Sequence, residues 1–130
     1  MHIVNIQVAT PEDDMKHSTD LKVTVNSGDI AVRIRRDTGF RDLTIRAKNG
    51  NAKTELHKLR EGFAQWYLYA WTKNGKISEW ILVSIDAMRA AGLFSESRPV
   101  KMNTDGYTGF VCYQFHELEN AGALIAKGNL

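Results

Sequence analysis

Guanidinium side chains are concentrated in one stretch of this sequence. Positions 20–48 carry the basic residues Lys22, Arg33, Arg35, Arg36, Arg41, Arg46 and Lys48. A guanidinium group presents a planar set of donors that fits phosphate oxygens, and each phosphate contact releases a counterion from a nucleic acid. The polar outer face of a half-exposed sheet also takes Arg, Lys and Thr, so a purely solvated surface is the alternative. The preference for Arg over Lys favours phosphate binding.

Three acids near this stretch have the chemistry of a metal site. Asp14 and Asp20 precede Lys22, the first of these basic residues, and Glu55 follows the last. Phosphodiester hydrolysis by a divalent metal needs two or more hard oxygen ligands, which lower the pKa of the bound water. An acid in the first turn of a helix is favoured by the helix dipole alone, and this second interpretation applies to Asp14 and Glu55. If a metal binds, Mg²⁺ is the expected ion.

These residues have to be positioned by short strands. The sequence predicts strands over 3–9, 20–25, 30–36 and 42–48. Short connections rich in turn-forming residues join the last three strands. Since short connections favour antiparallel pairing, the sequence predicts a three-stranded antiparallel meander. Since side chains alternate along a strand, Leu21, Val32, Ile34 and Ile45 would face the core. The opposite face of the sheet would then carry five basic side chains: Lys22, Arg33, Arg35, Arg46 and Lys48.

The second half of the chain predicts a mixture of strands and helices. Thr54 caps a helix over 55–62, and Asn74-Gly75 turns a hairpin between aromatic strands over 66–72 and 78–85. The remaining predicted elements are a short helix capped by Asp86 and ending at Gly92, a loop over 93–106, a strand over 107–115 and a helix over 116–126. The predicted fold class is therefore α+β: a three-stranded antiparallel meander, a helix, then an aromatic hairpin in a mixed sheet flanked by helices.

The order of elements resembles the αβββαβ core of the PD-(D/E)XK, or restriction-endonuclease-like, superfamily over residues 10–72. In that family an Asp opens one strand, and an acid and a Lys stand two positions apart on the next. Two registers fit this motif: Asp20 followed by Ala31 and Arg33, or Asp29 followed by Thr44 and Arg46. In both registers the acid is replaced and Arg stands in place of Lys. Some members of the family move the acid to the following helix, where this sequence has Glu55.

The resemblance implies a Mg²⁺-dependent endonuclease of the kind found in phages and mobile elements. Asp20 with Glu55 or Asp14 would hold the metal ion. Arg33, Arg46 and Lys48 would hold the scissile and flanking phosphates, and Lys22, Arg35 and Arg36 would extend the contact with nucleic acid. The altered motif leaves a second function open, in which a catalytically silent relative binds nucleic acid or a protein as an inhibitor or assembly protein.

The aromatic hairpin has two interpretations. Trp66, Leu68 and Ala70 alternate with Tyr67, Tyr69 and Trp71 along one predicted strand. A strand that is apolar on both faces is usually central in its sheet, which favours a core position. If its outer set were uncovered, the hairpin would bind a protein partner or a second copy of the chain.

Composition limits the class of protein. The 130 residues include 43% hydrophobic and 25% charged residues, which indicates one globular domain over 1–130. The net charge of +2 is too small to indicate nucleic-acid binding by itself. A single cysteine, Cys112, excludes an internal disulfide and suits a reducing compartment. No segment predicts a signal peptide or a membrane span, so we expect a cytoplasmic protein that does not bind membranes.

Overall fold

A computed structural model describes the backbone of residues 4–8 and 21–25 and the whole of residues 28–129. Strand β1 (Val4–Val8) pairs with β2 (Leu21–Val25) as an antiparallel ribbon. A four-stranded sheet has the order β3 (Ile30–Arg36), β5 (Trp66–Lys73), β6 (Lys76–Ser84) and β9 (Leu124–Asn129). A three-stranded sheet has the order β4 (Asp42–Asn49), β8 (Thr108–Gln114) and β7 (Lys101–Met102).

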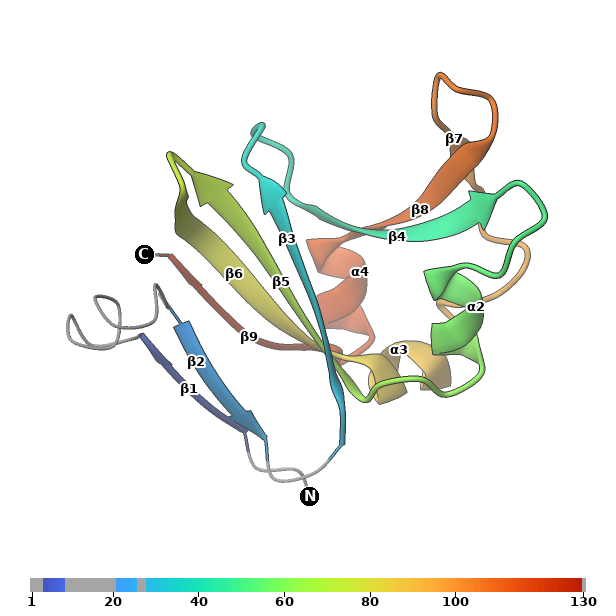
Figure 1. Cartoon of the computed structure of the whole chain (residues 1–130). Helices are drawn as coiled ribbons and strands as arrows, with labels where there is room; N and C mark the ends of the chain where they lie inside the picture. The colour runs from blue at the N-terminus through green and yellow to red at the C-terminus, as the bar shows by residue number, and fades with distance from the viewer. Residues whose placement is uncertain (1–3, 9–20, 26–27, 130) are drawn as a thin grey trace.

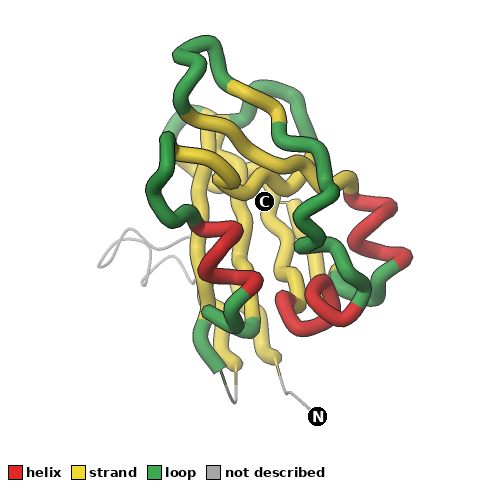
Figure 2. Tube along the Cα trace, turned by 90° about the vertical axis from the view of Figure 1, so that its right-hand side faces the viewer, coloured by secondary structure: helices red, strands yellow, loops and turns green. Residues whose placement is uncertain are grey.

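The short helices lie on one side of the four-stranded sheet. They are α2 (Glu55–Arg60), α3 (Ile85–Ala90) and α4 (Phe115–Asn120). Figure 1 shows the β4–β8–β7 sheet on this same side, set across the long sheet, with the β1–β2 ribbon on the opposite side. In Figure 2 the helices and their loops lie in front of the long strands. The α+β class and the mixed sheet are therefore confirmed, since β3 runs parallel to β5 while β6 and β9 pair antiparallel.

The predicted meander is wrong. Strands β2, β3 and β4 are not neighbours: β2 pairs with β1, β3 with β5, and β4 with β8. The turn at residues 37–41 changes the direction of the chain, so that β4 leaves the plane of β3 and joins the second sheet (Figure 1). Short connections favour adjacent pairing, but the non-local strands β5 and β8 provide the apolar partners that bury the core.

The core lies between the two sheets and the helices. Buried apolar side chains come from β4 (Leu43, Ile45), β5 (Tyr67, Tyr69, Trp71), β8 (Val111, Tyr113) and the three helices (Leu56, Leu59, Met88, Leu118). The predicted burial of Ile45 is confirmed. The predicted burial of Val32 and Ile34 is wrong, because these side chains are 59% and 57% exposed. In β3 it is the alternate set, including Arg33 and Arg35, that faces inward beside Tyr69 and Trp71 of β5.

Local sequence signals predict several boundaries well. The hairpin between β5 and β6 turns at Asn74 and Gly75, whose φ angles of 55° and 78° suit an Asn-Gly turn. Thr54 precedes α2 as predicted. The cap of α3 is Ser84 rather than Asp86, because the Ser84 hydroxyl accepts from the amide of Ala87 at 3.1 Å. The last helix is shorter than predicted: α4 ends at Asn120, and the chain then enters the edge strand β9 at Leu124.

Candidate functional site

A groove of about 640 Å³ separates the inner face of β3 from the outer face of the β4–β8 pair. Four cationic side chains line it: Arg33, Arg35, Arg46 and Lys101. Aromatic side chains line it beside them: Phe40, Tyr69 and Phe110. The groove therefore combines positive charge with exposed ring surface.

Two strands that do not pair with each other place the arginines. Arg33 and Arg35 project inward because β3 lies beside β5 in the register Arg33–Tyr69 and Arg35–Trp71. Arg46 projects outward from β4 because Ile45, on the opposite face, is buried in the core. The packing of one sheet across the other then brings the three guanidinium groups to one groove.

Arg35 is held by neighbours within the groove. Its Nη1 donates to the Tyr69 hydroxyl at 3.1 Å and lies 3.5 Å from Oδ1 of Asp42. The Tyr69 hydroxyl in turn lies 2.9 Å from Oγ1 of Thr44. This chain of contacts joins β3, β5 and β4, and it orders the Arg35 guanidinium before any ligand binds.

Arg33 and Arg46 lack such partners. Among the described residues neither side chain forms an ion pair or a hydrogen bond, and Arg33 is half-buried while Arg46 is exposed. The charge of Arg46 acts on Asp105, whose pKa is lowered mainly by hydrogen bonds from Thr108 and Tyr107 and to a smaller degree by Arg46. The Asp105 oxygens already accept three hydrogen bonds in the turn before β8. Both guanidinium groups are available to an anion.

Cys112 lies in the wall of the groove on β8. Burial, with the neighbouring Asp42 carboxylate, raises the pKa of its thiol. At neutral pH the group is therefore a protonated thiol, which is a poor nucleophile. A structural role for Cys112 agrees with this environment.

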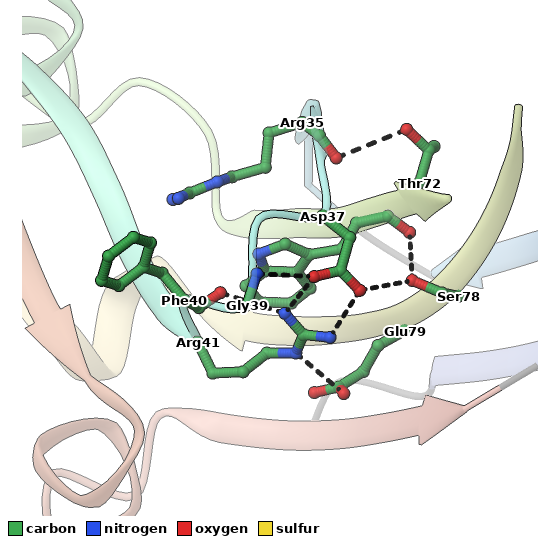
Figure 3. Close-up of polar contacts among 9 residues, drawn as sticks. Arg35, Asp37, Gly39, Phe40, Arg41, Thr72, Ser78 and Glu79 are labelled. Atoms are coloured by element: carbon green, nitrogen blue, oxygen red, sulfur yellow. Dashed lines mark hydrogen bonds and ion pairs between the residues drawn. The ribbon is translucent and has the colours of Figure 1, made fainter. Parts of the chain in front are cut away.

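The loop that joins the two walls is anchored by a salt-bridge cluster. Arg41 donates to both carboxylate oxygens of Asp37 at 3.0 and 2.8 Å and to Glu79 on β6 at 2.9 Å (Figure 3). Ser78 donates to Asp37 at 3.2 Å, and the Arg41 guanidinium lies 5.0 Å from the centre of the Trp71 ring. The hydrogen bonds from Arg41, and next that from Gly39, lower the pKa of Asp37 well below its ordinary value.

The remaining predicted nucleic-acid contacts do not line the groove. Arg36 is exposed on the opposite face of β3, and Lys48 is exposed beyond a register irregularity in β4. The prediction that Lys48 shares one sheet face with Arg33 is therefore wrong, because β3 and β4 belong to different sheets. Lys22 belongs to β2, which pairs with β1 alone in the described sheets; its side chain lies outside the described part of the structure.

Glu55 has a partner in the fold. The hydroxyl of Tyr67 donates to its Oε1 at 3.0 Å. Burial first, and then the Glu55 carboxylate, raise the pKa of Tyr67. Glu55 stands at the start of α2 and does not line the groove, and its predicted catalytic and metal-binding role stays a prediction.

Asp14 and Asp20, the other predicted metal ligands, lie outside the described residues. Within the described part of the chain, His, Cys, Asp and Glu side chains form no group of three that is able to hold a metal ion. The prediction of a Mg²⁺ site formed by Asp14, Asp20 and Glu55 stays a prediction.

Sequence reasoning missed Phe40, Lys101 and Phe110 as groove residues. Phe40 belongs to a turn and Lys101 to a segment predicted as loop, so neither carried a periodic signal. Phe110 was more accessible to prediction, because alternation along β8 places it opposite the buried Val111 and Tyr113. The missing information was the pairing of β4 with β8, which are distant in the sequence.

The aromatic hairpin belongs to the core. Tyr67, Tyr69 and Trp71 are fully buried on one face of β5, and Trp66 and Trp80 are buried on the other face of the sheet. The core interpretation is therefore confirmed. A partner or second copy bound through these rings would need an exposed aromatic surface, which the described hairpin lacks; whether the chain dimerises stays a prediction.

Comparisons with protein families, with curated proteins and with solved structures found no match. The resemblance to the PD-(D/E)XK superfamily thus stays a prediction. None of the described helices has the length and apolar character needed to span a membrane.

Proposed function

We propose that the groove binds the phosphate backbone of a nucleic acid. The observation that carries this proposal is the convergence of Arg33 and Arg46, which lie on different sheets and pair with no carboxylate of the described residues. A purely solvated sheet face would spread its charges over an open surface. Here the cations from two walls line the same groove, where their fields add.

The three arginines would serve in two ways. Arg35 is ordered by Tyr69 and Asp42, so it meets a phosphate with little further loss of conformational freedom. Arg33 and Arg46 have free donors, and the fork of a guanidinium binds two phosphate oxygens at once. Lys101 adds a fourth charge at the same groove.

Binding is favoured over hydrolysis by the balance of charge in the groove. Among the described residues that line it, Asp42 is the single acid, and it already pairs with Arg35. Mg²⁺-dependent hydrolysis, the activity implied by the family resemblance, would require Asp20 with Glu55 or Asp14 as metal ligands. Cleavage of labelled DNA and RNA with Mg²⁺ or Mn²⁺, lost in Asp20→Ala, is the result that would add catalysis to binding.

The test of binding compares two double variants that remove the same charge. Arg33→Ala with Arg46→Ala removes two groove cations, whereas Arg36→Ala with Lys48→Ala removes two exposed cations that do not line the groove. Hydrogen bonds to charged groups contribute roughly 1.5–3 kcal/mol each, so the groove variant should bind roughly 100-fold more weakly. The slope of log affinity against log salt should fall by about 1.4, since each phosphate contact on a single strand contributes roughly 0.7.

Fluorescence anisotropy with short DNA and RNA probes over a salt series measures both quantities. The control variant should retain most of the affinity of the natural chain. Equal losses in the two double variants would show that net charge rather than the groove is responsible. Absence of binding by the natural chain at low salt would overturn the proposal.

A further inference from the structure

We infer that the groove takes single-stranded nucleic acid and stacks one base on the ring of Phe40. This inference rests on the proposed function and specifies its ligand. Phe40 lies in the loop between β3 and β4, lines the groove and is 68% exposed. An isolated exposed apolar residue is ordinary on a protein surface. This ring, however, lines the same groove as the cations proposed to bind phosphate, where its exposed face is placed to stack on a base.

The loop holds Phe40 in place. The backbone carbonyl of Phe40 accepts a hydrogen bond from Nη1 of Arg41 at 3.1 Å, and the Asp37 carboxylate accepts one from the amide of Gly39 at 2.9 Å. Arg41 ties the same loop to Glu79 on β6. The backbone on both sides of Phe40 is therefore fixed, so a base can stack on the ring without ordering a mobile loop.

The direction of the side chains agrees with this role. Figure 3 shows the ring of Phe40 and the guanidinium of Arg35 projecting to the same side, away from the cluster formed by Asp37 and Arg41. Both side chains line the groove. A single-stranded nucleic acid with one phosphate bound at Arg35 would thus place the neighbouring base on the side where the Phe40 ring is exposed.

Single strands fit this arrangement better than duplexes. A base offers its π-face to an aromatic side chain only when it is unstacked, as in single strands, whereas a duplex keeps its bases stacked inside. The groove volume of about 640 Å³ falls in the range of roughly 300–1,000 Å³ typical of small-ligand sites. It has room for a short segment of a single strand rather than for a turn of a double helix.

Phe40→Ala is the test, with Phe63→Ala as its matched control. Phe63 is 52% exposed and does not line the groove. The probes are oligothymidylate DNA, oligouridylate RNA and a DNA duplex of equal length, each measured by anisotropy over a salt series. Base stacking on an aromatic residue contributes roughly 1–3 kcal/mol, so Phe40→Ala should bind the preferred single strand roughly tenfold more weakly. The salt slope should not change, and Phe40→Tyr should restore affinity because it retains an aromatic face.

The outcomes separate this inference from the proposed function. Tighter binding of either single strand than of the duplex, weakened by Phe40→Ala but not by Phe63→Ala, is the expected result; the favoured probe identifies DNA or RNA. Equal or tighter duplex binding overturns the inference, as does unchanged affinity in Phe40→Ala. In those cases the proposed function still stands if Arg33→Ala with Arg46→Ala weakens binding and lowers its salt slope, while Arg36→Ala with Lys48→Ala does not.

Discussion

Arg41 and Arg33 are close in the sequence but occupy opposite kinds of environment. Arg41 donates to Asp37 and Glu79 and lies over the Trp71 ring, so that nearby groups offset its charge. Arg33 is half-buried in the wall of a groove and forms no ion pair within the described residues. The same residue type thus stabilises the fold at one position and leaves charge available for a ligand at the other. The number of arginines in a segment does not distinguish these roles.

The largest expected effect is the difference in the free energy of unfolding lost when Arg41 and Arg33 are replaced by alanine. Arg41→Ala removes hydrogen bonds to two carboxylates and should lower the free energy of unfolding by about 2 kcal/mol. Arg33→Ala should change it by less than about 0.5 kcal/mol, because no described partner is lost. Chemical denaturation followed by tryptophan fluorescence measures both values. A loss of stability in Arg33→Ala equal to that in Arg41→Ala would remove the distinction between them.

A smaller effect concerns the acid dependence of the cluster. The pKa of Asp37 is lowered in the fold by the Arg41 guanidinium and the Gly39 amide, from an ordinary value of 3.8. A lowered pKa means that the folded state binds the proton less readily than the unfolded chain does. The stabilisation is therefore complete above about pH 5 and is lost progressively as the pH falls below the ordinary value of Asp.

Asp37→Asn provides the comparison for this acid dependence. The natural chain should be more stable than Asp37→Asn at neutral pH, and the difference should shrink below about pH 4. Thermal unfolding over a pH series measures it. A difference that is constant over the whole series would show that the Asp37 charge does not contribute.

The smallest expected effect tests the ordering of Arg35 in the groove. Tyr69→Phe removes the hydroxyl that contacts Arg35 and Thr44 but keeps the fully buried ring. The loss of stability should be about 1 kcal/mol, and nucleic-acid affinity should fall only about threefold, since the Arg35 charge remains. Denaturation and anisotropy on the same samples measure the two effects. Unchanged affinity would mean that the Tyr69 hydroxyl does not orient Arg35 for the ligand.

Local signals in the sequence were sufficient for most elements of the fold. The strands β3 and β5, the Asn74-Gly75 turn and the start of α2 follow from alternation, turn residues and capping, all of which act between near neighbours in the chain. The central position of β5 also followed, because a strand that is apolar on both faces needs cover on both. The short helices and the final strand β9 were harder to separate, because their apolar periods extend over few residues.

The site was predictable only in part. Sequence reasoning selected Arg33, Arg35 and Arg46, which do line one groove, but it brought them together by a pairing of β3 with β4 that the chain does not form. It also selected Arg36 and Lys48, which do not line the groove, and it missed Phe40, Lys101 and Phe110. Alternation fixes which residues share a face of one strand, yet it carries no information on which strands meet.

The sequence by itself determined the α+β class, the position of most strands and the presence of an arginine-rich segment. Tertiary structure alone decided which arginines are neutralised and which face a groove. The reason is that Arg41 forms an ion pair with Glu79, and β4 pairs with β8, across long separations in the chain. Contacts of this kind are selected by the burial of the whole core, which no local pattern of residues specifies.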